Sequence, residues 1–233
     1  MIKGIVFDID GTLLNHEQAL QISLTNLYSL LREKIPHSNF EEFLLTWKIK
    51  TDKYINDYLD GRITFEEQRI LRVQNVCRKW NYNLTPKKAL NIFKIYHTKY
   101  EQNWILYEDV LPCLTRLKNY SLGIISDGEG EQQRRKLAFT EIDSFFTSII
   151  ISGEVSIRKP NPSLFKMSAK ELNLALDEIL YVGDLLENDA LGALNAGMHG
   201  VLINRSGSIH DESNILQISK LTELPNIIET FRD

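Results

Sequence analysis

Acidic, hydroxyl and amine side chains recur at or beyond the ends of short apolar runs of this 233-residue chain. These side chains belong to Asp8, Asp10, Ser126, Asp127, Lys159 and Asp184. Carboxylate oxygens are the ligands that Mg²⁺ prefers in proteins. A lysine ammonium and a serine hydroxyl can hold an anion and offset its charge. The set therefore predicts a site for a divalent cation and an anionic substrate.

Asp8 and Asp10 are the candidate catalytic residues of this site. A carboxylate and a phosphate repel each other because both are anionic, and a magnesium ion between them removes that repulsion and aligns them for in-line attack. Asp8 would attack phosphorus and form an aspartyl-phosphate. Asp10 would protonate the leaving oxygen and later activate water. Asp184 would complete the metal site with Asp8 and Asp10.

Five further positions are expected to surround the phosphoryl group. Gly11 would let the chain bend away from its strand and expose backbone N–H groups to phosphate oxygens. The Ser126 hydroxyl and the Lys159 ammonium would hold the transferring group and offset its charge. Thr12 and Asp127 neighbour these residues in the sequence and are assigned to the same phosphate site.

Apolar segments that alternate with helical patterns must position these side chains. The strands are expected at residues 2–7, 121–126, 147–152, 179–183 and 199–203. Continuous apolar strands alternating with helices predict a parallel sheet covered on both faces, which is an α/β fold with a Rossmann-like, three-layer core. Open parallel sheets bind ligands beyond the carboxyl ends of their strands. The candidate residues stand at these ends.

The stretch between residues 17 and 103 contains no convincing strand and has the pattern of about four helices. Helix starts are predicted at Ser38 with Glu41, Thr64 with Glu67, and Thr85 with Pro86. We therefore predict one α/β domain, residues 1–14 and 105–233, interrupted by a helical cap, residues 15–104. The cap is expected to close over the site and to select the substrate.

Composition excludes several other classes of protein. The net charge of −4 gives no basic excess for a nucleic-acid backbone, and the longest basic run, residues 134–136, is expected on a solvated helix face. No apolar run approaches the roughly 20 residues that span a membrane. Five scattered histidines lack metal-ligand spacing, which argues against a zinc enzyme. Cys77 and Cys113 are predicted to be free thiols, so a cytoplasmic location is expected.

Four segments resemble, in order and spacing, the four motifs of the haloacid dehalogenase superfamily. They are Asp8-Ile9-Asp10-Gly11-Thr12, Ser126, Lys159-Pro160, and Gly183-Asp184 followed by Asn188-Asp189. The predicted helical insertion resembles the type-one cap of that superfamily. The resemblance covers essentially the whole chain, and it implies a magnesium-dependent enzyme with an aspartyl-phosphate intermediate.

The resemblance also implies a role for each matching residue. Asp8 would be the nucleophile and a magnesium ligand, and Asp10 would be the acid and base, with its carbonyl on the metal. Asp184 would be the third protein ligand. Asn188 and Asp189 would support the site, Asp189 by orienting metal-bound water or the lysine, although Asn188 also suits a helix N-cap. At Asp127 the chain departs from the asparagine that often follows the motif-two serine.

Asp10 favours phosphoryl chemistry, because dehalogenases of this superfamily usually lack an acidic residue there. The implied activity is hydrolysis of a small phosphorylated metabolite, such as a nucleoside monophosphate or a sugar phosphate, by a monomer or homodimer. Residues 57–64 are similar to caps of small-metabolite phosphatases, including pyrimidine nucleotidase-like and acylneuraminate phosphatase-like members. A phosphomutase of the β-phosphoglucomutase type, a 2-haloacid dehalogenase and a non-catalytic phosphate-binding module are the alternatives. In the cap, Trp47, Tyr54 and Arg72 are compatible with either a substrate pocket or a core.

Overall fold

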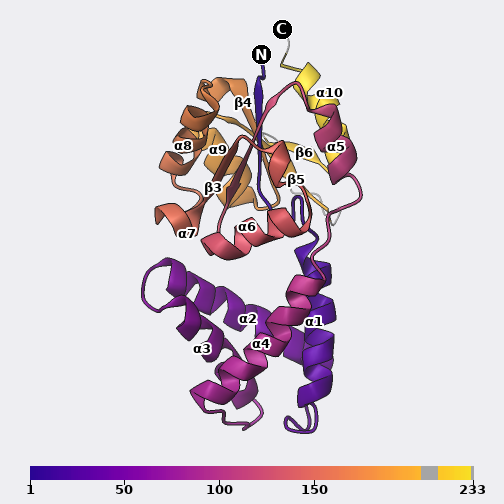
Figure 1. Ribbon diagram of the computed structural model, residues 1–233, viewed down its shortest axis with the longest axis vertical. Coiled ribbons are helices and arrows are strands. Elements are labelled where there is room, and N and C mark those ends of the chain that lie inside the picture. Colours follow the sequence, from indigo (N-terminus) through magenta and orange to yellow (C-terminus); the bar gives the residue numbers. More distant parts are fainter. Residues whose placement is uncertain (206–214, 232–233) are drawn as a thin grey trace. The chain divides into compact units, whose positions relative to one another are not determined.

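A computed structural model describes residues 1–205 and 215–231 of the chain. It divides into two compact units (Figure 1), which we call the α/β unit (Met1–Asn15 with Ile105–Asp233) and the helical unit (His16–Trp104). His210, one of the five histidines, lies outside the described residues. Within the described ranges, no helix combines the length and the apolar character needed to cross a membrane.

A parallel sheet forms the centre of the α/β unit, as predicted. Its strands are β1 (Gly4–Phe7), β2 (Ser121–Ser126), β3 (Ser148–Ile151), β4 (Ile179–Gly183), β5 (His199–Ile203) and β6 (Leu216–Ile218). The strands lie in the order β3-β2-β1-β4-β5-β6, and every neighbouring pair is parallel. Strand β6 was not expected, because its three residues are too few to give a periodic signal.

Helices connect these strands and cover both sides of the sheet (Figure 1). The α-helices are α5 (Val110–Arg116), α6 (Gly130–Phe139), α7 (Ser152–Val155), α8 (Pro162–Leu172), α9 (Gly192–Ala196) and α10 (Leu224–Glu229). Shorter turns are η1 (Asp143–Phe145), η2 (Leu176–Glu178), the π-helical η3 (Leu186–Leu191) and η4 (Leu221–Glu223). Helix α8 packs against β2 and β3, and α9 packs against β5. In Figure 1, α8 and α9 lie on one side of the sheet, with α5 and α10 on the other.

The strands are held in place by side chains that are buried on both faces. Every residue of β1 is buried, and its isoleucine, valine and phenylalanine suit a pleated, packed strand. Val6 and Tyr181 contribute to the core between the sheet and α8, where the rings of Phe165 and Tyr181 meet edge to face with centroids 5.2 Å apart. This packing fixes where β1 and β4 end, and therefore where the residues that follow them project.

The helical unit contains the helices predicted between residues 17 and 103. They are α1 (His16–Leu31), α2 (Phe40–Leu59), α3 (Phe65–Arg78) and α4 (Pro86–Gln102). Helix α4 packs against α1 and α3, and α2 packs against α3. Along α4 the ring of Tyr96 stacks on that of Tyr100 with centroids 5.9 Å apart, so this aromatic face packs the interior of the unit.

Two of the three predicted helix starts in this unit are confirmed. Thr64 and Glu67 form a reciprocal capping box at α3, and the Thr85 side chain caps α4 ahead of Pro86. The start predicted at Ser38 is wrong by one residue. Asn39 caps α2 instead, because the Ser38 hydroxyl donates to the carbonyl of Ile35 and is not available to the helix.

The chain enters and leaves the helical unit at adjacent backbone positions of the α/β unit. The amide of Asn15 donates to the carbonyl of Ile105 over 2.9 Å, and the amide of Tyr107 donates to the carbonyl of Leu13 over 3.0 Å. The two crossing segments are therefore fastened to each other directly after the Asp-Ile-Asp-Gly-Thr sequence.

Candidate active site

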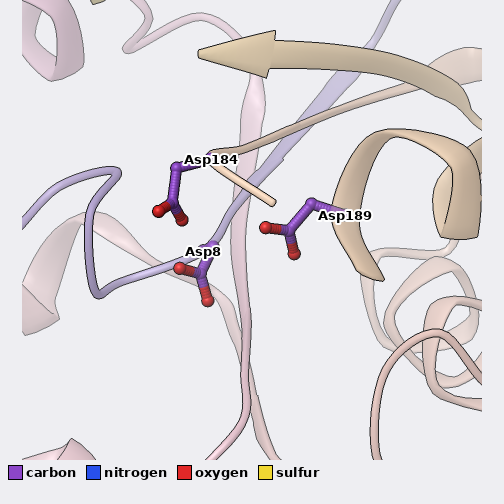
Figure 2. Close-up of side chains that lie close together, drawn as sticks. All are labelled: Asp8, Asp184 and Asp189. Carbon is purple, nitrogen blue, oxygen red and sulfur yellow. The ribbon is translucent and has the colours of Figure 1, made fainter. Parts of the chain in front are cut away.

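Three carboxylates meet at the carboxyl ends of the central strands. Asp8 directly follows β1, Asp184 directly follows β4, and Asp189 lies on the π-helical turn η3. One carboxylate oxygen from each lies within 4.8 Å of the others, and Figure 2 shows the carboxylates of Asp184 and Asp189 directed toward Asp8. The strand order explains this meeting, because β1 and β4 are neighbours and end at the same edge of the sheet.

Lys159 lies at the centre of a buried polar network beside this cluster. Its Nζ atom is 2.7 Å from Asp8 Oδ1, 2.6 Å from Asp189 Oδ1 and 3.2 Å from the hydroxyl of Tyr181. Burial alone lowers the pKa of Lys159, but the carboxylates of Asp189 and Asp8 raise that pKa well above its ordinary value. The network therefore holds a charged ammonium against the candidate nucleophile.

Asp189 is fully buried and positions both Lys159 and its own turn. Its Oδ1 also accepts a hydrogen bond from the Tyr181 hydroxyl over 3.0 Å, and its Oδ2 accepts one from the amide of Leu185 over 2.9 Å. The expectation that Asn188 is a helix N-cap is wrong. Asn188 lies inside η3, because the chain already enters that turn after Leu185.

Asp10 is bound by two side chains from α6. Lys136 Nζ lies 2.5 Å from Asp10 Oδ2, and Gln133 Nε2 lies 3.0 Å from the same oxygen. Gln133 Nε2 also donates to Ser126 Oγ over 2.8 Å and to the carbonyl of Asp127 over 3.1 Å. Gln133 thus connects the loop after β1 with the end of β2.

The prediction that residues 134–136 lie on a solvated face is wrong for Lys136. Lys136 is buried, whereas Arg134 forms a surface ion pair with Glu154 and Arg135 is exposed. Gln133, Lys136 and Leu137 are the inward positions of α6, with the spacing of one helical face. That spacing was present in the sequence, but the polar residue types concealed it.

Asp127 contacts the loop that carries Lys159. Its Oδ1 accepts a hydrogen bond from the backbone amide of Lys159 over 3.1 Å. Burial raises the pKa of the Asp127 carboxyl, and the nearby Lys159 charge opposes that rise. The carboxyl therefore joins the end of β2 to the loop before α8, and it does not turn away into solvent.

Gly11 lies in a left-handed conformation against Asp184. Its φ is +85°, and a Cβ atom at this position would lie 2.2 Å from Asp184 Oδ2. The amide of Gly11 itself donates to the carbonyl of Leu14 over 2.9 Å, so it is not presented to a phosphate in this conformation. Gly11 leaves space for Asp184, which differs from the amide-exposing role that we expected.

Thr12 is fully buried, and its carbonyl accepts a hydrogen bond from Arg205 over 2.6 Å.

Comparison with known proteins places the chain among hydrolases. A sequence model of haloacid dehalogenase-like hydrolases matches residues 5–203. The chain belongs to this family. The chain is 28% identical to mouse N-acylneuraminate-9-phosphatase over 99% of this hydrolase and 95% of the relative. It is 30% identical to the glyceraldehyde 3-phosphate phosphatase of Methanocaldococcus jannaschii over 100% of this hydrolase and 99% of the relative.

Solved structures show the same fold. The magnesium-bound HAD-hydrolase YfnB of Bacillus subtilis superposes with a TM-score of 0.78 at 21% identity, covering 97% of this hydrolase and 98% of that chain. The HAD phosphatase of Thermococcus onnurineus gives a TM-score of 0.66 at 27% identity, with 97% and 98% covered. Both likenesses extend over the α/β unit and the inserted helical unit alike.

The acidic cluster of this hydrolase has the properties of a cation site. Among the described residues, the buried oxygen Asp184 Oδ1 has no hydrogen-bond partner. Burial, and then the charge of Asp189, raise the pKa of Asp184 to about 7. Burial also raises the pKa of Asp8 well above its usual range, although Lys159 opposes this. A divalent cation would supply the positive charge that these buried oxygens lack, so the residues fit Mg²⁺.

The three cap residues considered as pocket candidates lie in the interior of the helical unit. Trp47, Tyr54 and Arg72 are all buried. The guanidinium of Arg72 donates to Gln68 and lies over the rings of Trp47 and Phe93, at 5.9 and 5.2 Å from their centroids. Burial lowers the pKa of Arg72 to about 10. Arg72 and Trp47 therefore pack against each other, and Tyr54 is buried in the same unit.

Proposed function

We propose that this hydrolase releases phosphate from a small phosphorylated metabolite, with Asp8 as the nucleophile and Mg²⁺ as the cofactor. The observation that carries the proposal is the environment of Asp8, whose buried carboxylate lies beside the buried Asp189, the half-buried Asp184 and, at 2.7 Å, the Lys159 ammonium. The acidic residue Asp10 two positions later supplies the proton donor that phosphoryl transfer to a carboxylate requires.

The residues divide the reaction among them. Asp8 attacks phosphorus while Asp10 delivers a proton to the leaving oxygen, and Asp10 then takes a proton from the water that cleaves the aspartyl-phosphate. Ser126 and Lys159 hold the phosphoryl oxygens. Asp8, the Asp10 carbonyl and Asp184 would hold Mg²⁺, which would offset the negative charges of the carboxylates and the phosphate. Asp189 keeps Lys159 in place through the 2.6 Å contact.

The named relatives support a sugar phosphate or another small phosphate monoester as the substrate. They are an N-acylneuraminate-9-phosphatase and a glyceraldehyde 3-phosphate phosphatase. We infer that the inserted helical unit selects among such compounds, because the strand-end residues contact only the phosphoryl group in this scheme. The two free cysteines, Cys77 and Cys113, support a location in the reducing cytoplasm.

Phosphate release from a panel of nucleotides, sugar phosphates and acylneuraminate phosphates tests the proposal, with magnesium and with a chelator. We expect release from at least one compound, dependent on magnesium. Asp8→Asn should lose at least about a thousandfold in kcat while still unfolding in a single cooperative transition, which shows that the fold is intact. Asp143→Asn, which changes an exposed acid of the same unit, should behave as wild type. Turnover that survives Asp8→Asn or the chelator contradicts the mechanism, and no release from any compound favours the mutase or binding alternatives.

A further inference from the structure

The carboxyl group of Asp10 is held from one side by a buried lysine and a buried glutamine of α6. Lys136 Nζ and Gln133 Nε2 both contact the same oxygen, Oδ2, at 2.5 and 3.0 Å. Lys136 and Gln133 are 3% and 2% exposed. A buried ammonium is destabilising unless a partner offsets its charge, so α6 carries this ammonium inward toward a specific partner.

Two donors on one oxygen restrict both the rotation of the Asp10 carboxyl and the place of its proton. A proton on Oδ2 would face the ammonium of Lys136, so the proton that Asp10 transfers must reside on Oδ1. The hydrogen bonds therefore decide which oxygen acts and in which direction it points. Gln133 connects this arrangement to the phosphate site, since its Nε2 also donates to Ser126 Oγ over 2.8 Å.

We propose that Lys136 and Gln133 are positioning residues that hold the Asp10 carboxyl for proton transfer through Oδ1. The inference rests on the proposed phosphatase function. In the first step the bond between Asp8 and phosphorus forms, the bond to the leaving oxygen breaks, and the proton of Asp10 Oδ1 passes to that oxygen. In the second step water attacks phosphorus, the bond to Asp8 breaks, and the water proton returns to Asp10 Oδ1.

The proposal differs measurably from a purely structural role of Lys136. A misplaced acid harms substrates whose leaving group needs a proton, such as alkyl phosphates, much more than p-nitrophenyl phosphate, whose phenolate departs unaided. A loss of packing or folding would lower both activities equally. Because kcat/KM reports the steps up to formation of the aspartyl-phosphate, the comparison is independent of the later hydrolysis step.

The experiment measures kcat and KM of Lys136→Met for p-nitrophenyl phosphate and for the best alkyl phosphate of the panel. We expect a loss of about a hundredfold in kcat/KM for the alkyl phosphate, within the range for general acid catalysis. The loss for the alkyl phosphate should lie mainly in kcat. For p-nitrophenyl phosphate, kcat/KM should fall less than about fivefold. Lys136→Arg, which keeps the charge and the donor, should recover most of the alkyl activity. Gln133→Met should lower kcat/KM for both substrates, because it also removes the hydrogen bond to Ser126 Oγ.

Arg135→Met is the matched control, because it removes an exposed basic residue from the same helix. It should leave both activities unchanged. Equal losses on the two substrates in Lys136→Met, or no loss, would overturn the positioning role. A crystal structure of Lys136→Met needs no substrate and should show the Asp10 carboxyl turned from its wild-type orientation, whereas an unmoved carboxyl counts against the inference. If wild type hydrolyses neither substrate, the phosphatase function fails, and this structure still decides the positioning of Asp10.

Discussion

The ammonium of Lys159 and the carboxylate of Asp189 form a buried ion pair, with 2.6 Å between Nζ and Oδ1. Lys159 uses a second donor on Asp8, so the position of the candidate nucleophile depends on a residue that lies on a different element. Removing one member of such a pair leaves an uncompensated charge in the interior, which is costly. Asp189 should therefore affect both the stability of the α/β unit and the chemistry at Asp8.

Asp189→Asn tests this dependence. The amide keeps an oxygen acceptor for Lys159 but removes the charge, so we expect the free energy of unfolding to fall by about 3 kcal/mol. We expect kcat/KM for phosphate release to fall about 10- to 100-fold, as for other supporting residues around metal sites. Urea unfolding and steady-state kinetics measure these changes. Asp177→Asn, an exposed acid of the same unit, is the control. Wild-type stability in Asp189→Asn would show that the pair is not important for folding.

Gly11→Ala tests whether the glycine provides space for Asp184. The new Cβ would lie 2.2 Å from Asp184 Oδ2, so Asp184 must move, and the magnesium concentration for half-maximal activity should rise at least about tenfold. Gly61→Ala is a matched control in the helical unit, since Gly61 also has a positive φ, +71°, but nothing lies within 4 Å of its Cβ position. Both variants bear backbone strain of about 1–2 kcal/mol. An equal magnesium requirement in the two variants would refute the role of space at Gly11.

Magnesium binding should depend on pH through Asp184. Because burial raises the pKa of this carboxyl to about 7, the metal-free site holds a proton below that pH, and the cation must displace it. Calorimetric titration should show affinity falling about tenfold per pH unit below 7 and levelling off above it. A dissociation constant that is equal at pH 6 and pH 8 would contradict this assignment.

The same carboxyl should influence the stability of the metal-free protein. Its pKa is higher in the folded than in the unfolded chain, so the folded state binds more protons between about pH 4 and 7. With a chelator present, the free energy of unfolding should therefore fall as pH rises through this range. Asp184→Asn cannot ionise and should show a smaller fall, measured by urea unfolding at pH 5 and pH 8. Equal falls in the two proteins would assign the effect to other groups.

Asp127 is expected to act through its hydrogen bond and not through its charge. Asp127→Asn retains an oxygen acceptor for the Lys159 amide, so kcat/KM should stay within about threefold of wild type. Asp127→Ala removes the acceptor and should lower kcat/KM about tenfold, because the Lys159 loop loses its connection to β2. Steady-state kinetics of the two variants distinguish these effects. A large loss in Asp127→Asn would show that the negative charge itself is required.

The sequence predicted the sheet and the residues after its strands because both follow from backbone regularities. Apolar runs identify buried parallel strands, and parallel strands end at a common edge, so the sequence alone predicts that Asp8, Ser126 and Asp184 lie close together. A polar residue type directly after an apolar strand is the local signal that predicts a site residue. The helix starts at Thr64 and Thr85 could be predicted for the same reason, because each cap involves residues within three positions of one another.

The missed features depend on packing between distant segments. The sequence predicts an exposed Lys136, because lysine usually lies in solvent and its partner Asp10 is remote in sequence. Tyr181 has the pattern of an ordinary strand residue, and its contact with Lys159 appears only when β4 and the loop before α8 come together. The sequence likewise predicts that the Gly11 amide faces phosphate, because its actual acceptor, the carbonyl of Leu14, depends on how the following turn closes.

The hydrogen bond between Asn15 and Ile105 has a consequence for how the protein folds. Residues 16–104 form one long connection between β1 and β2, and the hydrogen bond between Asn15 and Ile105 joins the two ends of this connection. The entropy lost in closing a loop rises only slowly with its length, so the size and internal order of the helices add little to the difficulty of pairing β1 with β2. Insertions, deletions and exchanges among those helices can therefore accumulate while Asp8 keeps its place at the end of the central strand.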